Sequence, residues 1–405
     1  MKESIEALAF FGGEPAFAED QHVGRPNIGD EEMVLGRVRQ ALRTRWLTND
    51  GPYVLEFERR VSDMLGVRHC VATSSGTMGL ELAVKAAGLS GEVIVPSFTF
   101  VGTVHALTWL GITPVFCDID PATHTIDPRR VEPLITPKTS GILGVHLWGR
   151  PCDVEALQSI ASSSNLTLLF DAAHAFGCSH GGAMVGAFGA AEVFSFHATK
   201  VCNAFEGGAV TTNDDEFADA VRIMRNFGFA GEDDVRTLGT NGKMNEASAA
   251  MGLTSVESIG DFIAHNERNY RTYRSHLSGI PGIKILSYDE LDRHNYHYVV
   301  ITVDEAAAGL TRDHLHRLLT AERVLARRYF YPGCHRCEPY RSQFSNVGQR
   351  LGSTEFVASR VLCLPTGTAV SDNDIAAICA LIRFCVANSY QVSGRIRPLE
   401  RPERA

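Results

Sequence analysis

Between about residues 67 and 215, short apolar runs alternate with segments long enough to form helices. Seven runs of three to five residues are rich in Val, Ile, Leu, Phe and Ala, and they cover 70–73, 92–95, 114–117, 141–145, 166–170, 192–196 and 209–211. Strands that are apolar on both faces are buried on both faces, which is typical of parallel strands joined by helices. The pattern therefore predicts an α/β fold with a mostly parallel central sheet covered by helices.

After residue 215 the pattern changes. Residues 215–270 are predicted to be helical, with an amphipathic stretch over 246–263, and 296–303 is predicted to be a strand, followed by helices at 311–325 and 372–386. This order predicts a smaller C-terminal α+β domain. We expect a large domain over 1–265 that includes the N-terminal segment, a small domain over 266–390, and a flexible tail over 391–405, where apolar periodicity is lacking.

The length of 405 residues exceeds what a single hydrophobic core usually organises, which agrees with two domains. The 38 Lys and Arg against 47 Asp and Glu give a net charge of −9. This acidic balance argues against nucleic acid or an anionic membrane as a partner, so any bound phosphate must be held by a local site. The N-terminus has no charged segment followed by an apolar one, and the apolar stretch 93–116 is interrupted by polar residues. We therefore expect a cytoplasmic protein without a signal peptide or a membrane span.

Ten cysteines are scattered through the chain, several of them inside apolar runs. In a chain of this length without a secretion signal, they are predicted to be reduced, buried thiols. The one pair with metal-ligand spacing is Cys334 and Cys337, which flank His335 and Arg336. Because no second pair lies nearby, we expect no metal site there.

Polar clusters follow several of the predicted strands, at the edge where ligands bind in open α/β sheets. Lys200 comes just after the run at 192–196, and Ser195 lies five residues before it. A lysine here is either a solvated loop cation or a nucleophile whose pKa is lowered by a pocket. The hydroxyl of Ser195 suits a phosphate group, and Gly207 and Gly208 would allow a tight turn back into the sheet.

Asp171 follows the apolar run 166–170, so its carboxylate enters apolar surroundings at a strand end. A buried carboxylate normally has a cationic partner. That partner is either the cation of a structural salt bridge or the protonated pyridine nitrogen of pyridoxal phosphate (PLP), where the contact keeps the ring an electron sink. His174, three residues later, is either a core histidine or a donor to the phenolic oxygen of the same ring.

Two further clusters have residue types that fit the same cofactor. Ser75-Gly76-Thr77 precedes a predicted helix that begins near residue 78, and the free N–H groups of a helix N-terminus bind anions. Phe98 and Phe100 follow the run at 92–95. One of them is a candidate to stack on an aromatic ring, although core packing is the commoner role of phenylalanine. Taken together, the four strand-end clusters predict a PLP site.

In order along the chain, the motifs S-G-T, P-S-F-T-F, D-A-A-H-A, S-F-H-A-T-K with E-G-G-A-V, and N-G-K-M-N-E-A-S-A-A-M-G-L resemble the sugar aminotransferase family. The resemblance covers most of the chain, from about residue 46 to residue 365. It implies a fold-type I, PLP-dependent enzyme that acts on a nucleotide-linked keto sugar.

Matched position by position, the resemblance implies roles for eight residues. Lys200 would form the covalent link to the cofactor, Asp171 would contact the pyridine nitrogen, and His174 would contact the phenolic oxygen. The phosphate would be bound by Gly76, Thr77 and Ser195, the ring would stack on Phe100, and Asn241 would reach the phosphate from the partner subunit. The last role implies a homodimer with shared active sites. On the residues alone, Asn241 is also interpretable as a loop residue that caps the helix beginning near Asn245.

The likeness is closest to 4-aminotransferases that act on dTDP-4-keto-6-deoxyglucose in natural-product deoxysugar pathways, with L-glutamate as amino donor. One branch of the family has histidine where this chain has Lys200 and dehydrates its substrate, so the lysine favours transamination. The stretch 326–335 corresponds to the family's substrate-side region, which makes Tyr331 and His335 candidate substrate contacts, although it departs from the commoner H-Y-P-P-x-H form. The alternatives are amination at C3 of a 3-keto sugar, a dehydratase that uses pyridoxamine phosphate, and a binding protein without enzymatic activity.

Overall fold

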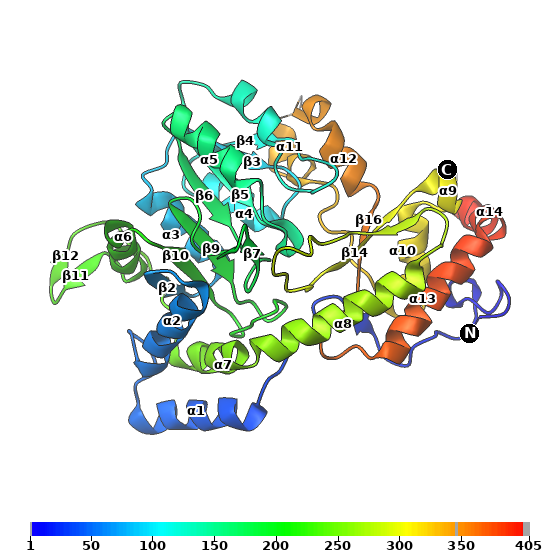
Figure 1. Ribbon diagram of the computed structural model, residues 1–405, viewed down its shortest axis with the longest axis horizontal. Coiled ribbons are helices and arrows are strands. Elements are labelled where there is room, and N and C mark those ends of the chain that lie inside the picture. The colour runs from blue at the N-terminus through cyan, green and yellow to red at the C-terminus, as the bar shows by residue number, and fades with distance from the viewer. Residues whose placement is uncertain (1, 345–346, 400–405) are drawn as a thin grey trace, which may run out of the picture.

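The computed structural model describes residues 2–344 and 347–399. Its centre is a seven-stranded sheet in the order β2-β10-β9-β6-β5-β3-β4 (Figure 1). The strands are β2 (His69–Thr73), β3 (Glu92–Pro96), β4 (Thr113–Cys117), β5 (Thr139–Val145), β6 (Thr167–Asp171), β9 (Ala191–Ser195) and β10 (Gly208–Thr212). Only β10 runs antiparallel to its neighbours. All seven predicted strands and the mostly parallel sheet are thus confirmed.

Helices cover both faces of this sheet, as consecutive apolar residues require. Alternate residues of each strand enter different cores: Leu169 and Val193 face one side, and Phe170 and Phe194 face the other. The first side is covered by α3 (Gly76–Ala86), α4 (Val101–Trp109) and α6 (Asp215–Arg225). The second is covered by α2 (Pro52–Leu65), α5 (Val154–Ser163) and α7 (Glu246–Glu257), and α1 (Glu31–Thr44) packs outside α7 (Figure 1).

The smaller domain is built on an antiparallel sheet of β13 (Ile283–Ile285), β14 (Val299–Val303) and β16 (Val361–Leu364). Its helices are α9 (Glu305–Ala308), α10 (Arg312–Ala321), α13 (Asp372–Ala387) and α14 (Ser389–Leu399). The long helix α8 (Ile259–Leu277) runs from the large domain to this sheet (Figure 1). The boundary predicted at 265/266 therefore falls inside a continuous helix.

Two segments lie on the opposite domain from the one predicted. The N-terminal residues pack on the small domain, where Leu8 is fully buried and β1 (Gln21–His22) pairs with β15 (Val324–Leu325). The segment with α11 (Tyr340–Gln343) and α12 (Gly352–Ala358) returns to the large domain, and Tyr340 joins its core. The order of elements in the sequence does not show that these segments pack on the other domain, because that depends on which hydrophobic core a few of their apolar side chains enter.

The prediction of helix throughout 215–270 is wrong between α6 and α7. A hairpin of β11 (Phe229–Gly231) and β12 (Asp234–Val235) projects from the sheet there (Figure 1). It depends on Gly228, which has φ +84°, because a Cβ at this position would lie 1.8 Å from the carbonyl oxygen of Thr237. A second hairpin pairs β7 (Ser179–His180) with β8 (Ala183–Met184). The helical stretch predicted over 246–263 is divided at Ser258 into α7 and α8.

The predicted flexible tail is also corrected over its first part. Residues 389–399 form α14, and Val392 and Ile396 are fully buried in the core of the small domain. Their spacing of four places them on one face of a helix. The rest of the predicted tail, residues 400–405, lies outside the described residues. In the described parts of the chain no single helix is long and apolar enough to cross a membrane. The pair α13 and α14 has the length and composition of a membrane span only when the two helices are taken together, and they are bent by 82° relative to each other.

Candidate active site

A cavity of about 320 Å³, here called the inner cavity, opens at the carboxyl edge of the central sheet. It brings together seven of the eight residues predicted to contact the cofactor: Gly76, Thr77, Phe100, Asp171, His174, Ser195 and Lys200. They come from the start of α3, the loop before α4, the end of β6 and the loop after β9. Residues far apart in the sequence converge here because parallel strands end at the same edge.

One end of the inner cavity is formed by the N-terminus of α3. Ser75 caps this helix, since its Oγ accepts a hydrogen bond of 3.1 Å from the N–H of Met78. Gly76 approaches the end of β9 so closely that a Cβ would lie 2.8 Å from the Cβ of Ser195. Gly208 packs under the same turn, because a Cβ there would lie 2.5 Å from the backbone of Ser75. The glycines therefore permit the start of α3 to lie close against β9 and β10, and free N–H groups and hydroxyls gather where an anion can bind.

Asp171 lies deeper in the inner cavity and is 6% exposed. Its Oδ2 accepts a 2.7 Å hydrogen bond from the Thr103 hydroxyl, and its Oδ1 accepts one of 3.0 Å from the N–H of Ala173. Because the Thr103 hydrogen is used in this way, the Thr99 hydroxyl, 2.9 Å away, must donate to Thr103. Burial raises the pKa of the Asp171 carboxyl, and the hydrogen bonds and the nearby Lys200 oppose the shift. Asp171 is thus held in position with lone pairs left for a cationic N–H.

His174 is a neutral imidazole in this site. Burial moves its pKa well below the ordinary value, and the positive charge of Lys200 acts in the same direction. Its Nδ1 accepts a hydrogen bond of 3.3 Å from the backbone N–H of Trp148. A neutral imidazole that accepts at Nδ1 carries its proton on Nε2, so His174 can donate a hydrogen bond to a ligand oxygen.

Lys200 stands on a turn whose shape is fixed by three hydrogen bonds. Its own N–H donates to the carbonyl of His197 (2.8 Å), and Nδ1 of His197 pairs with the hydroxyl of Thr199 (2.8 Å). From the small domain, Nε2 of His297 donates to the carbonyl of Thr199 (2.7 Å). Burial lowers the pKa of Lys200 to about 8, and the Asp171 carboxylate limits this shift. Far more of Lys200 is therefore uncharged and nucleophilic at neutral to mildly alkaline pH than of an ordinary lysine.

The two phenylalanines after β3 have different positions. Phe98 is 1% exposed and packs edge-on against Trp148, 6.3 Å between ring centroids, so it belongs to the core. Phe100 is 58% exposed and lies along the mouth of the inner cavity. Gly102 leaves room for its ring, because a Cβ there would lie 3.0 Å from Cδ1 of Phe100. Phe100 is thus the one available to stack on a bound ring.

Three predicted residues lie elsewhere. Asn241 is exposed, forms a backbone bridge with Asn226 and does not line the inner cavity. It is also not the helix cap, since the side chain of Asn245 caps α7 by accepting from the N–H of Ser248 at 2.9 Å. Tyr331 is half-exposed on the wall of a neighbouring cavity.

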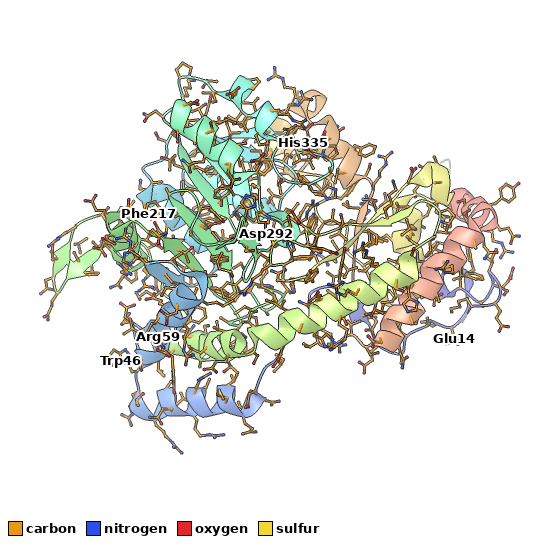
Figure 2. All side chains as sticks on the ribbon, viewed as in Figure 1. Glu14, Trp46, Arg59, Phe217, Asp292 and His335 are labelled. Carbon is orange, nitrogen blue, oxygen red and sulfur yellow. The ribbon has the colours of Figure 1, made fainter. Side chains whose placement is uncertain are left out.

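His335 is 3% exposed and lies beside α12 (Figure 2). Its Nδ1 pairs with the hydroxyl of Ser97 at 2.7 Å, and its Nε2 pairs with Glu355 at 3.2 Å. Both ring nitrogens are therefore used inside the protein, and the expected substrate contact at His335 is not what its surroundings favour. Beside it, the thiol of Cys334 contacts the carbonyl of Thr99. Within residues 2–344 and 347–399, no three His, Cys, Asp or Glu side chains are grouped to hold a metal ion, and the ten cysteines are free thiols.

Sequence reasoning missed four residues that line or support the inner cavity, namely Thr103, Trp148, His297 and Tyr298. It assigned no role to five others that lie inside the motifs it singled out, namely His197, Glu206, Arg327, Tyr329 and Phe330. Tyr298 directly precedes β14 in the small domain, and its ring centroid lies 4.4 Å from that of His174.

The groups of the inner cavity match the groups of PLP. The helix N-terminus with Gly76, Thr77 and Ser195 suits the phosphate, Asp171 suits a protonated pyridine nitrogen, and the Nε2–H of His174 suits the phenolic oxygen. Lys200 has a lowered pKa, so its uncharged amine can condense with the aldehyde carbon of PLP. The residues present therefore fit this cofactor.

Comparison with known proteins gives the same result. The sequence matches the DegT/DnrJ/EryC1/StrS aminotransferase family over residues 28–383. It is 38% identical over 363 residues to the dTDP-4-amino-4,6-dideoxy-D-glucose transaminase of Shigella dysenteriae, covering 89% of this chain and 98% of that protein. The transaminase of the same name from Escherichia coli is 36% identical, with 89% and 97% covered. A crystal structure of DesI, in the presence of its TDP-sugar product, has a TM-score of 0.94 at 49% identity and covers 97% of this chain and 100% of DesI.

These matches confirm the resemblance inferred from the ordered motifs, the fold class and the dependence on PLP. Because the match extends over most of its length, the chain belongs to the DegT/DnrJ/EryC1/StrS aminotransferase family.

Proposed function

We propose that this enzyme moves the amino group of L-glutamate to C4 of dTDP-4-keto-6-deoxyglucose, giving dTDP-4-amino-4,6-dideoxyglucose, in a cytoplasmic pathway of natural-product deoxysugar synthesis. The similarity along nearly the whole chain to transaminases named for that amino sugar, and to DesI with its TDP-sugar product, carries this proposal. The retained Lys200 supports transamination over dehydration.

The bound PLP supplies an electron sink and carries the amino group between the two substrates. Lys200 would hold the cofactor covalently at its aldehyde carbon. Once freed by the donor amine, its uncharged Nζ would take the proton from the α-carbon of the donor and deliver it to that cofactor carbon. Asp171 keeps a proton on the pyridine nitrogen, and its hydrogen bond from Thr103 prevents it from turning away. His174 holds the phenolic oxygen through Nε2–H. The same residues serve both half-reactions, because the second is the reverse of the first with the keto sugar as acceptor.

The direct test is incubation of the purified holoenzyme with L-glutamate and a panel of dTDP-keto sugars, with products identified by mass and NMR. A 4-amino-4,6-dideoxy sugar is expected. A 3-amino product, or a sugar that has lost its hydroxyl without gaining nitrogen, would replace the proposal by one of its alternatives. Absence of any change in the cofactor's absorbance with glutamate would indicate a binding protein.

We further infer a homodimer in which Asn241 serves the partner's cofactor site. Asn241 is exposed and lies outside the inner cavity of its own chain, so a role at a phosphate requires a second subunit. Exposed apolar side chains on α1 and just after it, Met33, Leu35, Leu42, Trp46 and Leu47, offer a surface for such a subunit.

Mixed dimers test this arrangement. Asn241→Asp would place a carboxylate against a phosphate in the neighbouring site, whereas Lys200→Ala damages only the site of its own chain. Each homodimer should be nearly inactive, but a hybrid contains one native site. With random pairing about half of the dimers are hybrids, so roughly a quarter of wild-type activity should reappear on co-refolding. Mixtures as inactive as their parents, while wild-type chains refold to active enzyme in parallel, would exclude the shared site.

A further inference from the structure

Lys200 lies between two backbone carbonyls that are both held by side chains from outside the central sheet. The carbonyl of Thr199, on one side, accepts a hydrogen bond of 2.7 Å from Nε2 of His297. The carbonyl of Val201, on the other side, accepts one of 3.3 Å from Nδ2 of Asn27. His297 is 5% exposed and Asn27 is 1% exposed, so water does not readily replace either donor. The backbone on both sides of Lys200 is therefore fixed, although the lysine lies in a loop.

Asn27 joins this loop to the small domain. Its Oδ1 accepts hydrogen bonds from the N–H and the hydroxyl of Thr368, at 3.0 and 3.1 Å, in the segment that follows β16. Because Oδ1 is occupied in this way, the amide nitrogen must face the loop. The carbonyl of Asn27 also accepts a 2.7 Å hydrogen bond from Nδ2 of Asn203, further along the loop. The same N-terminal segment packs on the loop at Gly24, where a Cβ would lie 2.9 Å from the Cβ of Thr199.

His297 belongs to the small domain, where it directly precedes Tyr298 and the strand β14. Burial lowers the pKa of His297 to about 4, and the positive charge of Lys200 acts in the same direction. At neutral pH the imidazole is therefore uncharged, and it holds the loop without adding a positive charge near the lysine. The ring centroid of Tyr298 lies 4.4 Å from that of His174. Two consecutive residues of the small domain thus contact the loop of Lys200 and the imidazole of His174.

A fixed backbone matters at Lys200 because its side chain has to act at more than one atom. In the proposed function, Nζ first bonds to the aldehyde carbon of the cofactor. Later it takes the proton from the α-carbon of the donor and delivers it to that cofactor carbon. The side chain must move between these positions, so the backbone has to keep Nζ within reach of both. Reacting atoms need to approach within about 3–3.5 Å, and a displacement of about 1 Å can cost about 100-fold in rate.

We propose that His297 and Asn27 are positioning residues, which fix the backbone on both sides of Lys200 and thereby hold its Nζ in place for bonding to the cofactor and for proton transfer. This inference rests on the proposed function for the role of Lys200, but not for the identity of the sugar. Neither residue lines the inner cavity, so both act through the loop that carries the lysine.

The test compares two substitutions at His297 in the capture of PLP by the apoenzyme. His297→Phe keeps an aromatic ring but removes the donor, whereas His297→Gln removes the ring but can donate from a similar position. The visible band of the lysine–cofactor link is followed as the PLP concentration is raised. In His297→Phe the limiting rate of capture should fall about tenfold or more. The PLP concentration that gives half this rate should stay within about twofold, because the phosphate and ring contacts are intact. His297→Gln should recover most of the rate.

Two further measurements complete the test. Asn27→Ala removes the other support from a different part of the chain, and it should slow capture by a similar factor even where His297→Phe does not fold. In the half-reaction with glutamate, the maximal rate of each slowed variant should fall about tenfold or more. The glutamate concentration that gives half of this rate should change by less than about twofold, since Lys200 acts after the donor has bound.

His294 supplies a matched control three residues before His297. It is also 5% exposed, and its Nε2 also pairs with a backbone carbonyl at 2.7 Å, that of Asp289. Its other hydrogen bond is to the carbonyl of Gly149 rather than to the loop of Lys200, and it does not line the inner cavity. His294→Phe should therefore lower the melting temperature about as much as His297→Phe and leave the capture of PLP unchanged.

A wild-type rate of capture in His297→Phe or in Asn27→Ala would overturn the proposal. Equal slowing by His294→Phe and His297→Phe would also overturn it, because the loss of any buried hydrogen bond would then explain the effect. Failure of His297→Gln to recover the rate would assign the effect to the ring rather than to the donor, with the same consequence. None of these measurements involves a sugar. An enzyme that behaves as described but aminates no dTDP-keto sugar would therefore overturn the proposed function and leave this inference standing.

Discussion

The hydrogen bond from Thr103 to Asp171 offers a sensitive test of how the inner cavity works. Thr103→Val replaces the hydroxyl by a methyl group of nearly the same shape, so the packing of α4 is retained. The carboxylate loses its 2.7 Å donor, and the Thr99 hydroxyl loses its acceptor. Asp171 is only 6% exposed, so water does not readily replace the missing donor.

The size of the effect follows from the charge of the acceptor. Hydrogen bonds to charged groups contribute about 1.5–3 kcal/mol, and this one is lost from the residue that holds a proton on the cofactor ring. Since about 1.4 kcal/mol corresponds to a factor of ten, the rate of the glutamate half-reaction should fall by about 10- to 150-fold. The pKa of Asp171 should rise further, because burial already raises it and the hydroxyl opposes that shift. The fall in rate should therefore be accompanied by a changed pH profile.

Single-turnover mixing with glutamate, followed by cofactor absorbance across pH, measures both effects. Thr103→Ser keeps the hydroxyl and should recover most of the rate. Thr99→Val removes the next hydroxyl in the chain and should cost less, because Thr103 still donates to Asp171. If Thr103→Val reacts at the wild-type rate, or if Thr103→Ser is as slow as Thr103→Val, the hydroxyl has no part in positioning Asp171.

Three further outcomes are expected at the same site. Lys200→Ala should abolish the visible band of the covalent lysine–cofactor link but still bind PLP through the phosphate and ring contacts; full turnover in dialysed protein would refute its role. Asp171→Asn should bind cofactor and lose far more in kcat than in cofactor affinity, because an amide cannot hold the ring proton by charge, and equal half-reaction rates would contradict this. Covalent capture of PLP by the apoenzyme should accelerate with rising pH around a midpoint of about 8, the lowered pKa of Lys200, since the uncharged amine is the nucleophile; a midpoint near that of free lysine would show that the pocket does not depress it.

The sequence predicts the inner cavity well because local rules govern it. Asp171, Ser195 and Lys200 each follow or end an apolar strand, and parallel strands bring their carboxyl ends to one edge whatever the rest of the chain does. The roles of Thr103 and His297 could not be predicted in this way. Their contacts to Asp171 and to the Thr199 carbonyl depend on how α4 and the small domain pack, which no pattern within one segment encodes.

Prediction from local pattern fails in the substrate-side segment 326–335, and His335 gives the physical reason. Its place in a substrate-side motif favours a ligand contact, yet its ring is used to attach residues 333–337 to the end of β3. The Ser97 hydroxyl pairs with Nδ1 of His335 at 2.7 Å and accepts from its N–H at 3.1 Å, and the Ser97 carbonyl accepts from the N–H of Cys334 at 2.9 Å.

This attachment holds the segment that carries Arg327 and Tyr331 across the mouth of the inner cavity. A single sequence does not distinguish a residue that positions the cavity wall, such as His335, from a residue that lines the cavity, such as Tyr331, because both lie in the same short segment. Only the direction of the side chain separates them, and the packing of two domains decides that direction. In this chain the packing turns His335 inward to Ser97 and Glu355, and it leaves Tyr331 half-exposed on the wall of a cavity next to the inner one.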